Sequence, residues 1–87
     1  MKIELHRNFI KKYVKLPIKI QDKFKERRNL FTMDQFHPLL NNHSLTGKYE
    51  GCRSINVTGD IRAIFSVKKD EVVVFIAIGS HPELYGI

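Results

Sequence analysis

Two histidines, His43 and His81, occupy positions from which an imidazole could transfer protons. His43 lies in an irregular part of the chain, and His81 directly follows a strongly apolar run that ends at Gly79-Ser80. A histidine at the end of a buried strand is well placed for acid–base catalysis, because its unperturbed pKa is about 6.5. The alternative for each is an exposed loop histidine without a chemical role. His6 and His37 carry no such signal, since one begins a helix and the other precedes a proline.

Three further side chains could take part in the chemistry of a site. Asp60 follows Gly59 and is most simply a turn residue. Arg62 is expected on the polar face of a sheet, where its fork of donors could pair with a carboxylate or hold a phosphate. Tyr85 either packs the C-terminal tail or offers a ring on which a base can stack.

No spacing in the chain predicts a metal or a cofactor. The sequence has no His-Glu-x-x-His and no Cys-x-x-Cys, and its one cysteine, Cys52, excludes an internal disulfide framework. Zinc needs three or four ligands, and the spacing of His43, Asp60 and His81 does not support such a set. Phosphate-binding glycine loops and nucleophile elbows are also missing. We therefore expect neither cofactor nor metal.

The N-terminal third predicts one strand and two helices. Residues 2–5 alternate in polarity, as a short strand does. From Arg7 a helix is expected that Pro17 ends, and the same proline can begin a second, antiparallel helix. Apolar residues fall on one face of each helix (Phe9, Ile10, Tyr13 and Val14; then Ile20, Phe24 and Phe31).

The rest of the chain predicts a long loop and three strands. Residues 32–51 have no sustained period, and we expect mostly loop with one helical turn near 34–36. A loop this long in a small domain suggests a function. Residues 52–58, 61–67 and 72–78 have the period of strands, and the last is apolar on both sides, which indicates a central position.

Polarity decides the register of the first two of these strands. A three-residue loop, Thr58-Gly59-Asp60, pairs Val57 with Ile61 and Ile55 with Ala63. One face is then apolar, and the other holds mainly polar side chains (Ser54, Asn56, Arg62 and Ser66, with Ile64 as the exception). The sequence therefore predicts an α+β fold of β-α-α-β-β-β order, in which two N-terminal helices pack on one face of a small, mainly antiparallel sheet. The polar face, beside the 32–51 loop and the C-terminal tail, is where we expect the site.

Charge indicates a polyanionic partner. The 87 residues, 10.2 kDa, fit one domain spanning 1–87, and no apolar run approaches the ~20 residues that cross a bilayer. We expect a protein of the reducing cytoplasm, away from membranes. The formal net charge is +6, and residues 1–28 alone carry +7. Such asymmetry suggests nucleic acid or an acidic protein segment, although a basic helix face that only aids solubility is the alternative.

Four segments together carry a family resemblance. They are His43-Ser-Leu45-Thr-Gly47, Gly51-x-Arg53-Ser54, Val57-Thr-Gly-Asp60-x-Arg62-x-Ile64-Phe65 and Ile78-Gly79-x-His81-x-x-Leu84-Tyr85-Gly86. With the β-α-α-β-β-β order, they resemble the RelE/ParE toxin superfamily over essentially the whole chain, and within it the YafQ-like branch.

The resemblance implies the toxin of a type II toxin–antitoxin system that cleaves mRNA on the ribosome and is inhibited by a cognate antitoxin. We expect a monomeric toxin within that complex. The implied reaction is metal-independent: the ribose 2′-OH attacks the adjacent phosphate, which requires a base, an acid and a cation. By position the implied catalytic residues are His43, Asp60, His81 and Tyr85, with Arg62 as the candidate for charge stabilisation. Lys48 and Arg53 are weaker candidates for RNA contact.

One position departs from the family pattern. Asn56 stands where YafQ-like toxins have a further active-site histidine, and an amide can contact RNA but cannot transfer a proton at neutral pH. Which of the remaining groups is acid and which is base stays open. Two other functions also stay open: a ParE-like toxin that binds DNA gyrase without cutting RNA, and a decayed toxin that only binds its antitoxin.

Overall fold

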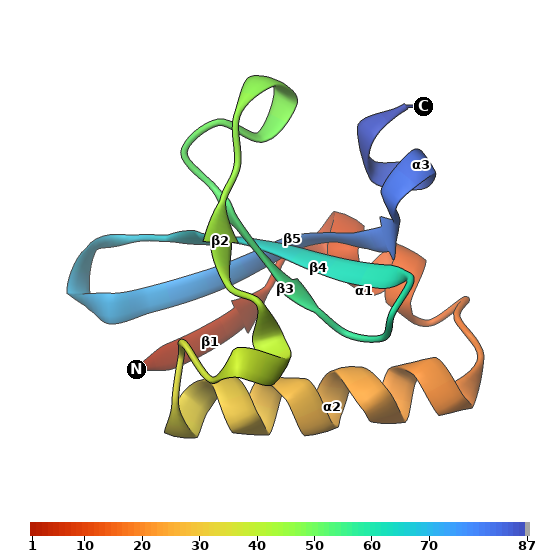
Figure 1. The fold of residues 1–87 in the computed structure, drawn as a ribbon, viewed down its shortest axis with the longest axis horizontal. Helices are drawn as coiled ribbons and strands as arrows, with labels where there is room; N and C mark the ends of the chain where they lie inside the picture. Colours follow the sequence, from red (N-terminus) through yellow and green to blue (C-terminus); the bar gives the residue numbers. More distant parts are fainter. Residues whose placement is uncertain (87) are drawn as a thin grey trace.

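The computed structural model describes residues 1–86, in which five strands form one sheet of order β1-β5-β4-β3-β2 (Figure 1). The strands are β1 (Lys2–Leu5), β2 (His43–Ser44), β3 (Arg53–Asn56), β4 (Ile61–Val67) and β5 (Val72–Ser80). Only β1 and β5 pair in parallel, and the other pairs are antiparallel. The predicted α+β class with a mainly antiparallel sheet is therefore confirmed, and β5 has a neighbour on each side, as its apolar sequence indicated, although β4 is the middle strand.

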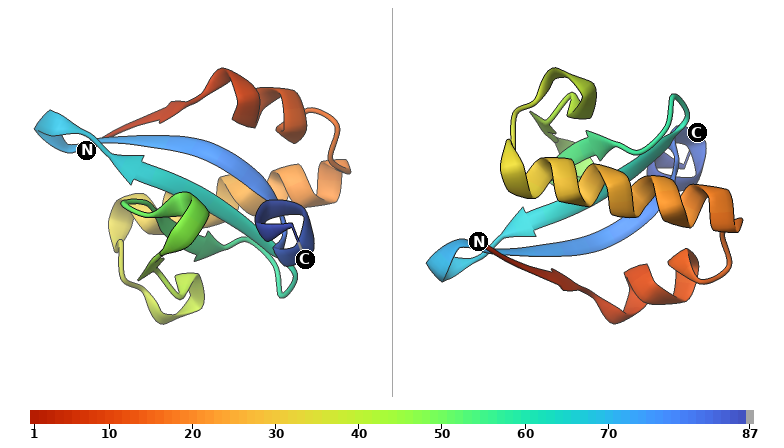
Figure 2. Two further views of the ribbon diagram at one scale, coloured as in Figure 1. Left: turned by 90° about the horizontal axis from the view of Figure 1, so that it is seen from above. Right: turned by 90° about the horizontal axis from the view of Figure 1, so that it is seen from below.

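Two helices pack against this sheet, the second across one face and the first beside β5 at the edge. They are α1 (Arg7–Tyr13) and α2 (Ile18–Met33), which run in opposite directions (Figure 2). Their phenylalanines form an aromatic core against the strands. The ring centroids of Phe9 and Phe24 are 5.1 Å apart, and those of Phe24 and Phe75 5.2 Å. Farther along α2, Phe31 meets Phe65 edge-on at 5.0 Å. Such edge-on contacts add to the area that the rings bury.

Pro17 separates the helices, although the helix ends differ slightly from the prediction. The N–H groups of Lys15 and Leu16 bond carbonyls three residues back, so the chain after Tyr13 tightens into turns before the proline. Pro17 itself is extended, with φ −54° and ψ 145°, and α2 begins one residue later at Ile18.

The predicted register of β3 and β4 is confirmed. Ile55 pairs with Ala63, and the N–H of Val57 donates to the carbonyl of Ile61 at 2.8 Å. The three-residue connection is held from within, because Thr58 Oγ1 accepts hydrogen bonds from the N–H groups of Asp60 and Ile61. The strand itself ends at Asn56, two residues before the predicted end.

The structure corrects the interpretation of residues 32–51. The chain does turn at 34–37, where the N–H of His37 donates to the Asp34 carbonyl at 3.1 Å. The 3₁₀ helix, however, is η1 (Pro38–Leu40), because Pro38 presets the backbone and His37 Nδ1 accepts the N–H of Leu39. The short strand β2 and a second 3₁₀ turn, η2 (Gly47–Tyr49), follow it and were not predicted. The β4–β5 connection contains a third, η3 (Lys69–Glu71).

A third helix, α3 (His81–Tyr85), was also not predicted, and it changes the polar face of the sheet. The β2–β3 hairpin with η2, and α3, both stand on the face opposite α2 (Figure 1). As a result Ser54 and Ile64, expected on an open surface, are both 0% exposed. Within residues 1–86, none of the helices is long and apolar enough to cross a membrane.

Candidate active site

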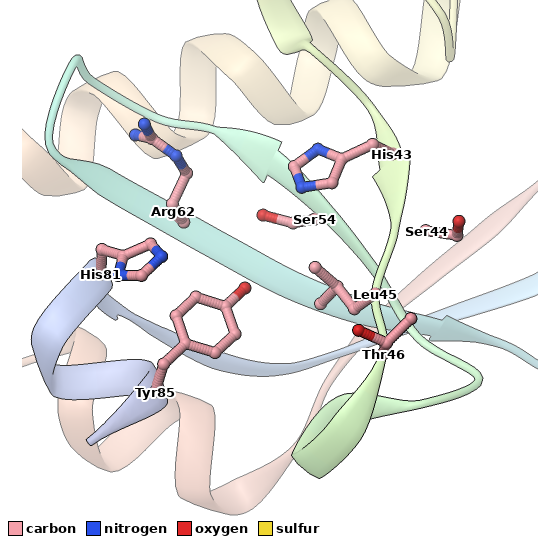
Figure 3. A pocket seen from close by; sticks show the side chains of 8 residues that line it. All are labelled: His43, Ser44, Leu45, Thr46, Ser54, Arg62, His81 and Tyr85. Carbon is pink, nitrogen blue, oxygen red and sulfur yellow. The ribbon is translucent and has the colours of Figure 1, made fainter. Parts of the chain in front are cut away.

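A groove of about 450 Å³ opens between the β2–β3 hairpin and α3 (Figure 3). Its floor comes from the sheet, through Ser54 on β3 and Arg62 on β4. One wall is β2 with the residues after it, and the other is α3. The groove is lined by His43, Ser44, Leu45, Thr46, Ser54, Arg62, His81 and Tyr85. Segments nearly forty residues apart in the sequence thus place His43 and His81 on one cavity.

The ring of His43 is oriented by a backbone carbonyl. Its Nδ1 lies 2.8 Å from the carbonyl oxygen of Asn41, and a carbonyl can only accept, so Nδ1 is the donor. Asn41 adopts a left-handed conformation, with φ 46° and ψ 48°, which asparagine tolerates better than most residues. In the neutral ring, Nε2 therefore carries the lone pair. His43 is exposed, so this nitrogen is available to act as a base.

His81 is positioned by the first turn of α3. Ser80 caps this helix: its hydroxyl accepts the N–H of Glu83, while the Glu83 carboxylate accepts the N–H of Ser80. Gly79 lets the helix fold back closely, since a Cβ there would lie 3.3 Å from Glu83 Oε1. The Ser80-x-x-Glu83 spacing is the sequence signal that could have revealed α3.

An ion pair joins α3 to α1. Lys12 Nζ lies 2.5 Å from Glu83 Oε2, which joins α1 to the helix that carries His81 and Tyr85. The hydrogen bond from Lys12, and then that from the Ser80 N–H, lower the pKa of Glu83 to about 2. The carboxylate is therefore ionised throughout the physiological range.

Tyr85 forms an aromatic wall with its neighbours. Its ring centroid lies 4.5 Å from that of His81, one turn earlier in α3, and 5.8 Å from that of Tyr49 in η2. Burial, and then the nearby Tyr49, raise the pKa of the Tyr85 phenol, against an opposing effect of Arg62. The hydroxyl is accordingly protonated at neutral pH and can donate a hydrogen bond. Tyr49 was not singled out from the sequence.

Among the residues of 1–86 that line the groove, Arg62 is the only one of the acidic residues, lysines and arginines. Its Nη1 donates to the carbonyls of Thr58 and Gly59 at 3.0 and 3.1 Å, so the guanidinium is braced against the β3–β4 turn. Across the strands it pairs with Gly79, two residues before His81. Arg62 thus contributes a positive charge to the groove lining, with its guanidinium directed toward the β3–β4 turn and away from His81 (Figure 3).

The structure does not bring every predicted residue into the groove. Asp60 is exposed in the β3–β4 turn and is not part of the lining. Lys48 reaches across to α3, where its Nζ donates to the Leu84 carbonyl at 3.3 Å. Arg53 donates to Asn42 Oδ1 at 2.8 Å and lies over the Phe36 ring. Asn56 is half-buried outside the lining.

Sequence reasoning missed Ser54 as a site residue. The alternation of β3 placed it on the polar face, but its burial depends on β2 and α3, which were not predicted. Among residues 1–86, no cluster of three or more His, Cys, Asp or Glu side chains is arranged to hold a metal ion.

Residues 1–86 match the model of the family described as "Bacterial toxin of type II toxin-antitoxin system, YafQ". The chain belongs to the YafQ family. The resemblance to RelE/YafQ-like toxins is thereby confirmed over the whole described chain.

Solved structures agree with this family membership. YafQ from E. coli strain BL21(DE3) is 26% identical, with 98% of each chain covered and a TM-score of 0.79. The E. coli DinJ–YafQ toxin–antitoxin complex also matches, with 26% identity, 98% of this chain and 97% of that chain covered, and a TM-score of 0.72. A YoeB/ParE toxin from Agrobacterium tumefaciens, 18% identical over 93% of this chain and 99% of that chain, has a TM-score of 0.77 and shows the fold alone. No curated protein matches the sequence significantly.

Proposed function

We propose that this YafQ-family toxin is a ribosome-dependent mRNA endoribonuclease that uses histidine acid–base catalysis. The observation that carries the proposal is the convergence of His43 and His81 on one groove, with Arg62 at its floor. Attack of a ribose 2′-OH on the adjacent phosphate needs a base, an acid for the leaving 5′-oxygen, and positive charge near the phosphorane. It leaves a 2′,3′-cyclic phosphate and a 5′-OH.

The hydrogen bonds of the groove suggest how the roles divide. His43 has its Nδ1–H bound to the Asn41 carbonyl, which leaves Nε2 to accept the 2′-OH proton. His81 lies on the opposite wall and would then protonate the leaving oxygen. Arg62 would stabilise the phosphorane, and Tyr85 would stack on a base. Asp60 reaches this chemistry only if the turn moves, so we assign it a supporting role in RNA contact, with Lys48, Arg53 and Asn56.

We also propose that a cognate antitoxin inhibits this toxin, with one toxin chain in each toxin–antitoxin unit. Support comes from the E. coli DinJ–YafQ complex and from the charge of residues 1–28, which is +7. An acidic, flexible antitoxin segment would be attracted to these helices and could fold upon them.

The test is controlled expression followed by primer extension on a translated model transcript. New 5′ ends should appear with the wild type and disappear with His81→Ala, because loss of an acid–base group typically costs about 10²–10⁴ in rate. His37→Asn is the matched control, since asparagine keeps a capping acceptor and position 37 lies outside the groove lining. Growth arrest without cleavage ends, together with DNA double-strand breaks, would overturn the proposal in favour of gyrase binding.

A further inference from the structure

The hydroxyl of Ser54 is buried in the floor of the groove without a partner. Ser54 is 0% exposed, and its Oγ has no hydrogen-bond partner among residues 1–86. It nevertheless belongs to the groove lining, and its Oγ points toward the space between His43, Arg62 and His81 (Figure 3). The strand register explains this position, because β3 places Ser54 opposite His43 of β2 on one side and Ile64 of β4 on the other.

Such a hydroxyl destabilises the folded protein. On burial it loses its hydrogen bonds to water and gains none in return, whereas an apolar side chain would lose nothing. The neighbouring Ile64, also fully buried, shows that this layer accommodates apolar groups. A buried hydroxyl directed into a groove therefore suggests a hydrogen bond that forms only when the groove is occupied.

The charge of the groove indicates the chemistry of the occupant. Arg62 supplies a fixed positive charge, and no carboxylate of residues 1–86 is part of the lining. An anion that contacts both Arg62 and Ser54, on neighbouring strands, requires the guanidinium to turn from the carbonyls of Thr58 and Gly59 into the groove. Because Ser54 is fully buried, this contact requires the side chains that line the groove to move slightly when the anion binds.

We infer that Ser54 Oγ–H donates a hydrogen bond to a non-bridging oxygen of the phosphate that is cleaved, an inference that rests on the proposed function. The non-bridging oxygens gain negative charge as the 2′-oxygen attacks, so the bond strengthens in the transition state. Ser54 then contributes to rate more than to RNA binding.

Phosphorothioate substitution tests this contact. Purified toxin is mixed with ribosomes programmed with mRNA that carries one phosphorothioate at the cleaved linkage, each diastereomer separately, and single-turnover rates are measured. Ser54→Ala should slow cleavage of the all-oxygen RNA about 10²-fold, as loss of one oxyanion donor does. Sulfur accepts hydrogen bonds poorly, so one diastereomer should slow the wild type much more than it slows Ser54→Ala. The other diastereomer should affect both proteins equally.

Urea unfolding and a control variant distinguish this catalytic role of Ser54 from a purely structural one. Because the substitution removes an unpaired buried hydroxyl, Ser54→Ala should unfold at the same urea concentration as the wild type or higher. Ser66→Ala, on the same face but outside the groove lining, should cleave like the wild type. The inference is overturned if each phosphorothioate slows the wild type and Ser54→Ala by the same factor. It is also overturned if Ser54→Ala cleaves the all-oxygen RNA as fast as the wild type does. A wild type that cleaves no RNA overturns the proposed function and this inference with it.

Discussion

Tyr85 shows how the environment of one residue restricts its chemistry. Burial raises the pKa of its phenol, so the side chain stays protonated at every pH at which the fold is expected to work. Its ring lies against His81 and Tyr49. The group therefore offers a stacking surface and a hydrogen-bond donor, but no anion.

Two substitutions at Tyr85 separate these contributions. If the ring stacks on an RNA base, Tyr85→Ala should lower kcat/KM by about 5–150-fold, since one base–aromatic stack is worth about 1–3 kcal/mol. Tyr85→Phe keeps the ring and should retain most of the activity. Cleavage of a short mRNA on programmed ribosomes measures both variants. If Tyr85→Phe is impaired as strongly as Tyr85→Ala, the hydroxyl and not the ring is the working group.

At the scale of elements, alternation and helical period were sufficient for most of the fold and for part of the site. The register of β3 and β4 followed from polarity, and the apolar character of β5 indicated its position between two other strands. In contrast, β2 has only two residues, and it forms because β3 lies beside it. A segment this short has no periodic pattern from which a strand could be predicted. The burial of Ser54 depends on this strand and on α3, which explains why the sequence indicated the histidines but not the hydroxyl between them.

The Lys12–Glu83 ion pair links α1 to α3. Glu83→Gln should keep the capping box but lose the ion pair, and because both side chains are about half exposed the loss should be at most about 1 kcal/mol. The single-turnover cleavage rate should fall by a larger factor than a loss of about 1 kcal/mol in unfolding free energy explains, because α3 carries His81 and Tyr85. Urea unfolding and single-turnover cleavage measure the two effects. Lys12→Met should give the same result, and the double variant should be no worse than either single one.

The pH dependence of that pair has a definite sign. The pKa of Glu83 is lowered in the folded protein to about 2, from 4.5 as its ordinary value. Its stabilising effect is therefore complete above pH 4.5 and is lost as the pH falls from there toward 2. The difference in unfolding free energy between wild type and Glu83→Gln should be largest near neutral pH and vanish near pH 2. A difference that persists unchanged at pH 2 would show that the charge of Glu83 does not stabilise α3.

At the scale of the whole molecule, the basic helix α2 and the groove lie on opposite faces of the sheet. Residues 1–28 form β1, α1 and most of α2, and α2 lies across the sheet from the groove (Figure 1). The groove itself holds one permanent cation, Arg62, among the described lining residues. Binding to a large polyanion through the helices would therefore leave the groove free to receive an RNA strand.

This separation predicts how ribosome binding depends on salt. Four exposed lysines of the helical face (Lys11, Lys15, Lys19 and Lys25) can be replaced by glutamine without breaking an ion pair among residues 1–86. Each phosphate contact adds about 0.7–0.9 to the steepness with which log affinity falls with log salt concentration. The quadruple variant should therefore have a slope that is shallower by up to about 3–4, and it should bind more weakly at low salt. Lys68→Gln with Lys69→Gln, in the β4–β5 connection, is the control and should bind like the wild type. Filter binding or sedimentation across a salt series measures both, and an unchanged slope in the quadruple variant would show that the basic helices do not contact ribosomal RNA.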